Sequence, residues 1–200
     1  QIVYNGPSKG EEMYEHLENH GILNLDSLDE AKRVVDYCKA HADKQYTVGM
    51  RINMDLGAAN FISRFGLEPD SKDMLEVVKL IKDTPNLKLI GLHCHISRCR
   101  GVDAWAERAK IMLDMADKYI DDVPQYISLG SGMFADMADY LRNQFGGDSV
   151  PTYEDYCKAT IQPFAEHYKD VENKPMLFTE PGTTVVARYL SFVSKVLSIK

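Results

Sequence analysis

The sequence predicts an α/β protein built as a (β/α)8 barrel of the TIM type, without its first two strands. Three observations favour this fold. Short apolar or alternating runs that suit buried strands recur along the chain, with amphipathic helical segments between them. This alternation implies parallel strands. Each strand also ends in a polar or glycine-containing cluster, which is typical of a barrel site, whereas a doubly wound sheet usually concentrates its site at one switch point.

The predicted elements follow one another in a regular order. Strands are expected at residues 2–5, 22–25, 46–52, 87–90, 126–129 and 176–179, and helices at residues 9–19, 28–41, 71–82, 103–119 and 153–168. The helix at 28–41 follows Asp26 and Ser27, either of which can cap it. Its apolar residues recur at helical spacing, as do those of the helix at 71–82. Residues 54–69 form a connection long enough to suggest a functional loop.

The sequence predicts two domains. The barrel is expected to occupy residues 1–188, and the alternating residues 189–200 are expected to begin a C-terminal β-domain or connecting strand. Because the chain opens at Gln1, without an initiator methionine and directly on a strand, we expect it to be a piece of a longer protein.

Composition excludes several classes of partner. The net charge of −7 opposes binding to nucleic acid, and no apolar stretch approaches the length that crosses a membrane. The four cysteines are scattered and do not form the framework of a small secreted domain, which favours reduced thiols and a cytoplasmic location.

The most informative stretch is residues 91–97, in which His93 and His95 alternate along a strand. Side chains two residues apart point to the same face, so both imidazoles can face one ligand at the end of the strand. A hydrogen-bonded structural histidine is the commoner explanation of such a residue. A metal is not expected, because Cys94 points the other way and the spacing fits no common zinc pattern.

Seven motifs, in order over nearly the whole chain, resemble the alanine-racemase-type (fold type III) enzymes that use pyridoxal phosphate, specifically the diaminopimelate/ornithine decarboxylase group. The motifs are Asn5-Gly6-Pro7-Ser8-Lys9, Leu25-Asp26-Ser27, Met50-Arg51-Ile52-Asn53, Arg64-Phe65-Gly66, Gly91-Leu92-His93-Cys94-His95-Ile96, Leu129-Gly130-Ser131-Gly132 and Glu180-Pro181-Gly182.

The resemblance implies a cofactor, pyridoxal 5'-phosphate, and a role for each matching residue. His95 matches the histidine that stacks on the pyridine ring, and Glu180 matches the acid that keeps the ring nitrogen protonated. Gly130, Ser131 and Gly132 match the loop whose backbone N–H groups approach the cofactor phosphate. Arg51 matches a supporting arginine near the cofactor.

Three departures from the family pattern concern the remaining cofactor-binding residues. Where the family has a small-residue segment ending in a phosphate-binding serine, this chain has Ser97 and Arg98, and either residue is a candidate for the phosphate contact. Ser131 stands in place of the middle glycine of the family triplet. After Gly182, Thr183 replaces an arginine, which leaves a hydroxyl without a charge and puts the substrate preference in doubt.

The implied function is decarboxylation of a diaminopimelate-like or basic amino acid by a homodimer. In the family, the Schiff-base lysine lies on the first barrel strand, which would precede Gln1, and Lys9 is not that residue. We therefore expect no catalytic residue in this chain and no activity from it alone. An amino-acid racemase and a pyridoxal-phosphate barrel that has lost its chemistry are the alternatives.

Overall fold

The computed structural model describes residues 2–57, 63–134, 139–144, 150–186, 189–196 and 198, apart from the side chains of residues 141, 142 and 183. Six strands form one sheet in the order β1-β2-β3-β4-β5-β6, and every neighbouring pair is parallel. The strands are β1 (Val3–Tyr4), β2 (Ile22–Leu25), β3 (Tyr46–Ile52), β4 (Leu87–His95), β5 (Tyr126–Gly130) and β6 (Met176–Glu180).

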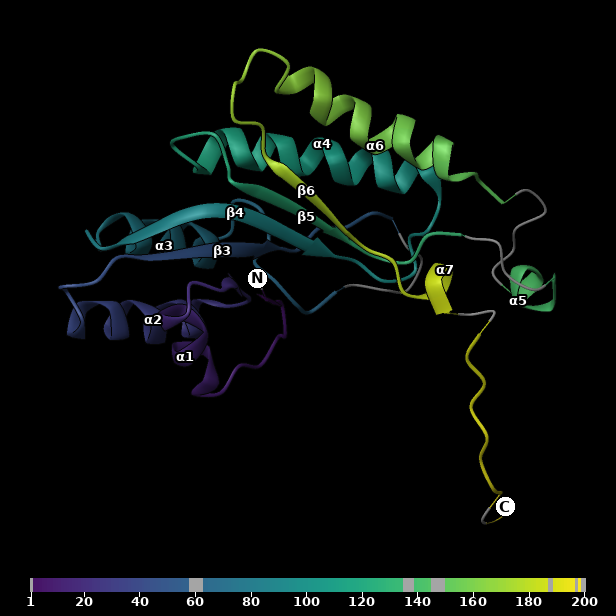
Figure 1. Cartoon of the computed structure of the whole chain (residues 1–200), viewed down its shortest axis with the longest axis horizontal. Coiled ribbons are helices and arrows are strands. Elements are labelled where there is room, and N and C mark those ends of the chain that lie inside the picture. Colours follow the sequence, from purple (N-terminus) through teal and green to yellow (C-terminus); the bar gives the residue numbers. More distant parts are fainter. Residues whose placement is uncertain are drawn as a thin grey trace.

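The longer helices connect the strands and cover the outside of the sheet. The helices are α1 (Glu12–Glu18), α2 (Leu28–Ala40), α3 (Lys72–Lys82), α4 (Val102–Tyr119), α5 (Asp139–Gln144), α6 (Tyr153–His167) and α7 (Thr183–Val186). In Figure 1, α4 and α6 run side by side along one side of the sheet, and α1 and α2 lie on the other side of β3. Side chains of Ser27 and Ser71 cap α2 and α3 by accepting backbone N–H bonds.

The two faces of the sheet differ because side chains alternate along each strand. The outward-facing residues of the strands are apolar and join the helices in one buried core; they include Leu23, Leu25, Met50, Leu92, Ile127 and Leu129. Towards the carboxyl ends of the strands the inward-facing residues are largely polar; they include Asn24, Arg51, His93, His95, Ser128 and Glu180. Towards the amino ends, Ile22, Tyr126 and Phe178 belong to a small apolar cluster. The outer face therefore holds the fold together, and the concave inner face carries the chemically active groups.

Tyr126 crosses the inner face at its amino end. Its side chain passes over Gly91 of β4 and Gly49 of β3, and its hydroxyl donates to Asn24 Oδ1 of β2 at 2.7 Å. A Cβ at Gly91 would lie 2.4 Å from two atoms of the tyrosine ring, so only glycine leaves room for this crossing. One aromatic side chain thus connects four neighbouring strands.

The sheet is curled into an open half-barrel. In a flat sheet, the five spacings between β1 and β6 would separate their ends by roughly 24 Å. Instead, Asn5 Nδ2, just after β1, donates to Glu180 Oε1 at the end of β6 at 2.5 Å. The first and last strands therefore approach each other at their carboxyl ends, on the concave face.

All six predicted strands are present, and their consecutive order is that of a barrel and not of a doubly wound sheet. The predicted helix at 9–19 begins later, at Glu12, because Lys9 is buried and bonded to Glu30 and to the Gly6 carbonyl. The short helices α5 and α7 were not predicted. β1 and β6 each have one neighbouring strand among the described residues.

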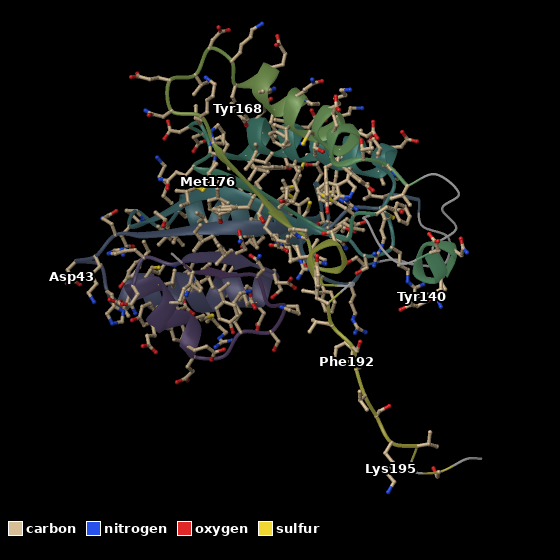
Figure 2. All side chains as sticks on the ribbon, turned by 45° about the vertical axis from the view of Figure 1, so that its right-hand side comes forward. Asp43, Tyr140, Tyr168, Met176, Phe192 and Lys195 are labelled. Carbon is tan, nitrogen blue, oxygen red and sulfur yellow. The ribbon has the colours of Figure 1, made fainter. Side chains whose placement is uncertain are left out.

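The C-terminal segment lies away from the sheet. Residues 189–196 form no strand, so the alternation of the sequence does not produce one here, and Figure 2 shows Phe192 and Lys195 well away from the body of the protein. The assignment of 189–200 to a further domain stays a prediction. Among the described residues, no helix combines the length and the hydropathy that crossing a membrane requires.

The Tyr126 crossing predicts the effect of a single methyl group. Gly91→Ala is expected to lower the free energy of unfolding by about 2 kcal/mol, because the methyl group would overlap the tyrosine ring. Urea unfolding monitored by circular dichroism measures this change. Gly182→Ala is the matched control, since no atom lies within 4 Å of the added Cβ there. Equal stability of the two variants would contradict the crossing.

Candidate cofactor site

The main cavity, of about 600 Å³, opens on the concave face at the carboxyl ends of the strands. It is lined by residues from four strand ends and from one loop: Asn5, Pro7, Arg51, Ser63, Arg64, Phe65, His93, His95, Ser97 and Glu180. Four of the nine predicted cofactor-binding residues, namely Arg51, His95, Ser97 and Glu180, therefore line one space.

Glu180 is the centre of the polar contacts in this cavity. Oε1 accepts hydrogen bonds from Asn5 Nδ2 at 2.5 Å and from Ser128 Oγ at 3.2 Å. Oε2 lies 3.1 Å from His95 Nδ1. Asn5 is itself oriented by Asn24, whose Nδ2 donates to its Oδ1 at 2.6 Å. The carboxylate is thus fixed in position by contacts from the end of β1, from β4 and from β5.

His93 and His95 both reach Glu180, but their surroundings differ. The side chain of His93 is 1% exposed, and its Nε2 lies 3.2 Å from Glu180 Oε1. Neither ring nitrogen of His93 has an aligned hydrogen-bond partner among the described residues. The side chain of His95 is 41% exposed at the cavity. The role that the resemblance implies for His95 stays a prediction.

The charges of the cluster follow from burial and contact. Burial acts to raise the pKa of Glu180, but the adjacent imidazoles of His93 and His95 outweigh it and hold the pKa of this carboxyl well below its ordinary value. Burial lowers the pKa of His93, against the opposing attraction of Glu180. At neutral pH the cavity therefore presents a carboxylate beside a neutral, buried imidazole.

Arg51 supports the cavity wall through its fixed contacts. Nη1 donates to Asp26 Oδ1 at 2.9 Å, and this ion pair is buried. Nη2 donates to the His95 carbonyl at 3.4 Å, and the guanidinium lies over the Phe65 ring. Because Asp26 balances the charge of Arg51, the arginine adds little net positive charge to the cavity. Its main role is to hold the ends of β2, β3 and β4 together.

The Gly130–Gly132 loop follows β5 directly. His95, Gly130 and Glu180 are register partners on β4, β5 and β6. A Cβ at Gly130 would lie 2.4 Å from His95 Nδ1 and 2.6 Å from Glu180 Oε2, so the glycine lets the imidazole and the carboxylate meet. Ser131 is buried, and its hydroxyl donates to the Ile96 carbonyl.

The other predicted residues are less closely tied to the cavity. Ser97 lines it, whereas Arg98 is exposed and has a positive φ of 70°. Gly182 is exposed just before α7, with no neighbouring atom within 4 Å of a Cβ built on it. The side chain of Thr183 lies outside the described residues. The roles assigned to these residues stay predictions.

Sequence reasoning missed the residues that hold Glu180. Asn5 and Ser128 had no assigned role, although each occupies the end or the inner face of a strand, and this position was the available signal. Their partner is too far along the chain for any local pattern to show the contact: Asn5 and Glu180 are separated by 175 residues.

Two kinds of ligand suit this donor set. His93, His95 and Glu180 each offer one ligand atom, and the three atoms lie within 4.8 Å of one another, which suits a divalent transition metal. The spacing of residues 93–95 gives no sign of this group, because Glu180 lies 85 residues further along the chain than His95. The same carboxylate, beside a flat and partly exposed imidazole, also suits a protonated pyridine ring. The expectation of no metal stays a prediction.

The Asn5–Glu180 contact leads to a test of stability. Asn5→Asp is expected to lower the free energy of unfolding at pH 7 by about 2 kcal/mol, because a carboxylate replaces the amide that donates to Glu180. The Glu180 carboxylate would raise the pKa of the introduced carboxyl, which would therefore be protonated towards pH 4. The loss in the free energy of unfolding should become smaller there. Urea unfolding at both pH values measures it, with the exposed Asn173→Asp as control. A loss of the same size in both variants would argue against the contact.

The lowered pKa of His93 predicts that the stability of the fold depends on pH. The pKa of this histidine in the folded state is lowered below the unfolded value of about 6.5, so the unfolded state binds the proton more readily and stability falls as pH decreases below 6.5. Between pH 7.5 and 5.5, His93→Gln should remove up to about 1 kcal/mol of this loss. Unfolding titrations at the two pH values measure the difference, and His167→Gln controls for removal of a histidine elsewhere. An unchanged pH profile would contradict a neutral His93.

Comparison with known proteins assigns the family. Residues 1–187 match the family described as "Pyridoxal-dependent decarboxylase, pyridoxal binding domain". The chain is 32% identical over 192 residues to diaminopimelate decarboxylase from Staphylococcus aureus, covering 91% of this chain and 43% of that protein. It is 23% identical over 209 residues to the Archaeoglobus fulgidus enzyme, covering 100% and 48%. The chain thus spans about half the length of the curated relatives it matches.

Solved structures share the fold. Diaminopimelate decarboxylase from M. jannaschii superposes with a TM-score of 0.72 at 24% identity, over 93% of this chain and 44% of that chain. Arginine decarboxylase of the Paramecium bursaria Chlorella virus gives a TM-score of 0.58 at 20% identity, over 82% and 40%. The six parallel strands of the half-barrel match the barrel domain of diaminopimelate decarboxylase. The chain belongs to the pyridoxal-dependent decarboxylase family, in its pyridoxal-binding barrel domain.

Proposed function

We propose that this chain is part of a pyridoxal-phosphate-dependent decarboxylase that acts on a diaminopimelate-like or basic amino acid. The observation that carries the proposal is the Glu180 carboxylate, held ionised beside His95 on the floor of a cavity large enough for a cofactor. Membership of the family supplies the chemical context for this arrangement.

The residues of the cavity have distinct parts in the proposed reaction. Pyridoxal 5'-phosphate supplies an electron sink for the negative charge that remains on the substrate carbon when carbon dioxide leaves. Glu180 would accept a hydrogen bond from the ring nitrogen of the bound cofactor and keep that nitrogen protonated. His95 would pack its flat imidazole against the cofactor ring. Asn5 and Ser128 hold the Glu180 carboxylate in place.

The substrate class follows from relatives and not from a contact in this chain. The matched curated relatives are diaminopimelate decarboxylases, and one solved relative from M. jannaschii is a co-complex with L-lysine. A viral arginine decarboxylase has the same fold. A basic or diaminopimelate-like amino acid is therefore the substrate that we propose.

The chain alone is proposed to be inactive. The Schiff-base lysine is proposed to lie on a strand before Gln1, and further site groups to come from the partner subunit of a homodimer. Among the described residues, no lysine lines the main cavity, and Lys9 Nζ is buried against Glu30 at 2.8 Å. Borohydride reduction of this chain with pyridoxal phosphate should label no lysine stoichiometrically. One fully labelled lysine would overturn the proposed inactivity.

The role of Glu180 is tested in the full-length protein. Glu180→Gln is expected to lower the rate of carbon dioxide release from diaminopimelate or lysine-like substrates by about 100-fold, because a neutral amide does not stabilise a protonated ring nitrogen. The exposed Glu172→Gln serves as the control. A variant that keeps its rate within about threefold would refute the assignment.

Product analysis separates this function from the alternatives. Release of carbon dioxide identifies a decarboxylase, whereas inversion of the amino acid without that release identifies a racemase. A full-length protein that binds the cofactor and does neither would indicate a barrel without chemistry.

A further inference from the structure

We propose that, in the protein without its cofactor, His93, His95 and Glu180 bind one divalent transition-metal ion, and that this ion and the cofactor exclude each other. The ligands are two imidazole nitrogens from β4 and one carboxylate oxygen from β6. Metal binding is independent of the proposed function. The exclusion rests on that function, because the cofactor ring is proposed to use the same carboxylate.

The separations of the donor atoms are those of neighbouring ligands around one metal ion. Glu180 Oε1 lies 3.2 Å from His93 Nε2, and Glu180 Oε2 lies 3.1 Å from His95 Nδ1. Zinc bonds of about 2.0–2.1 Å place adjacent ligand atoms roughly 2.9 Å apart at a right angle and roughly 3.3 Å apart at the tetrahedral angle. The three donor groups already lie within 4.8 Å of one another, and the partly exposed ring of His95 can turn to close the remaining distance.

The side chain of His93 is the second observation that points to an ion. It is 1% exposed, and neither of its ring nitrogens has an aligned hydrogen-bond partner among the described residues. A buried polar group without a partner is costly, so such a group in a folded protein calls for an explanation. Because Nε2 already lies beside the Glu180 carboxylate, a metal ion bound there would give its lone pair a partner.

The Glu180 carboxylate has the outer contacts that are typical of a metal ligand. Asn5 Nδ2 donates to Oε1 at 2.5 Å, and Ser128 Oγ donates to the same oxygen at 3.2 Å. Such contacts orient a ligand before the ion arrives. A Cβ at Gly130 would lie 2.4 Å from His95 Nδ1 and 2.6 Å from Glu180 Oε2, so the glycine keeps open the space where these two donor atoms meet.

The chemistry of the three ligands selects the class of metal. Imidazole nitrogens suit zinc, copper, nickel and cobalt, whereas magnesium and calcium prefer oxygen ligands. Among the described residues no thiolate belongs to the group, and Cys94 is buried in the core behind β4. Three protein ligands leave coordination positions open to the cavity of about 600 Å³, so water or another small ligand would complete the coordination.

The ion and the cofactor compete for Glu180. In the proposed function, the ring nitrogen of the cofactor hydrogen-bonds to this carboxylate, and the ring packs against His95. A metal ion held by the same two side chains takes the lone pairs that the ring nitrogen needs, and its positive charge repels a protonated ring. The expectation that no metal is bound would then apply to the protein loaded with cofactor.

The first experiment measures metal binding alone. The full-length protein, freed of cofactor, is titrated with Co²⁺, whose visible absorption reports its coordination geometry, and Zn²⁺ but not Mg²⁺ should displace the Co²⁺. His93→Gln, His95→Gln and Glu180→Gln should each weaken Co²⁺ binding at least about tenfold, because the loss of an outer partner alone commonly costs about 10–100-fold. His167→Gln, which removes a histidine paired with an acid on the surface, is the control.

A measurement on the parent protein needs no variant to fold. The proton NMR spectrum of the Co²⁺ form should contain two strongly shifted, exchangeable imidazole resonances, one from each histidine ligand. A parent protein that binds no Co²⁺, a spectrum without these resonances, or three variants that bind Co²⁺ as tightly as the parent would each overturn the metal site.

The second experiment tests the exclusion. Calorimetric titration uses 4'-deoxypyridoxine 5'-phosphate, which has no aldehyde to react with lysines. Saturating Zn²⁺ should weaken its binding to the parent apoprotein at least about tenfold, and Mg²⁺ should leave the affinity unchanged. An affinity that Zn²⁺ does not change would overturn the exclusion. If the parent protein without metal does not bind this ligand, the proposed function fails and the exclusion with it, while the Co²⁺ titration still decides whether the metal site exists.

Discussion

The hydrogen bond between Asn5 and Glu180 is the contact on which the site depends. It joins the end of the first strand to the end of the last, and so it requires the six-stranded sheet to curl. The same carboxylate receives Ser128 and meets both histidines. Because these partners come from different strands, the geometry around Glu180 exists only when the curvature of the sheet is correct. The fold and the charge state of the site are therefore coupled.

The buried ion pairs show how the strand ends stay aligned. Lys9 pairs with Glu30, whose carboxylate also accepts the Asp26 N–H at 2.9 Å, and Asp26 pairs with Arg51. Removing one member of such a buried pair leaves an unpaired charge, which is costly. This chain of contacts extends from the loop after β1 to the end of β3. The charges along this wall of the cavity are therefore paired with one another. The Glu180 carboxylate differs, because its contacts are with amide, hydroxyl and imidazole groups.

Much of the architecture could be predicted because its signals are local. Period-two strands and helical stripes gave all six strands and five of the seven helices. The positions of the polar clusters at strand ends indicated where the site lies, and four of the nine predicted residues line the cavity. The tail beyond residue 188 shows that alternation alone is not enough to form a strand. A strand also needs a neighbouring strand to pair with, and residues 189–196 have none in the described structure; their assignment to a further domain stays a prediction.

The sequence by itself determined which side chains of a strand share a face, because alternation along a strand needs no knowledge of the partner strand. It thus placed His93 and His95 on one face and singled out Glu180 as an acid at a strand end. Only the tertiary structure decided that these groups meet, that His93 is buried while His95 is partly exposed, and that Arg100 lies against Gly132. Those outcomes depend on the curl of the sheet and on the space left by glycines, which are properties of contacts between residues distant in the chain.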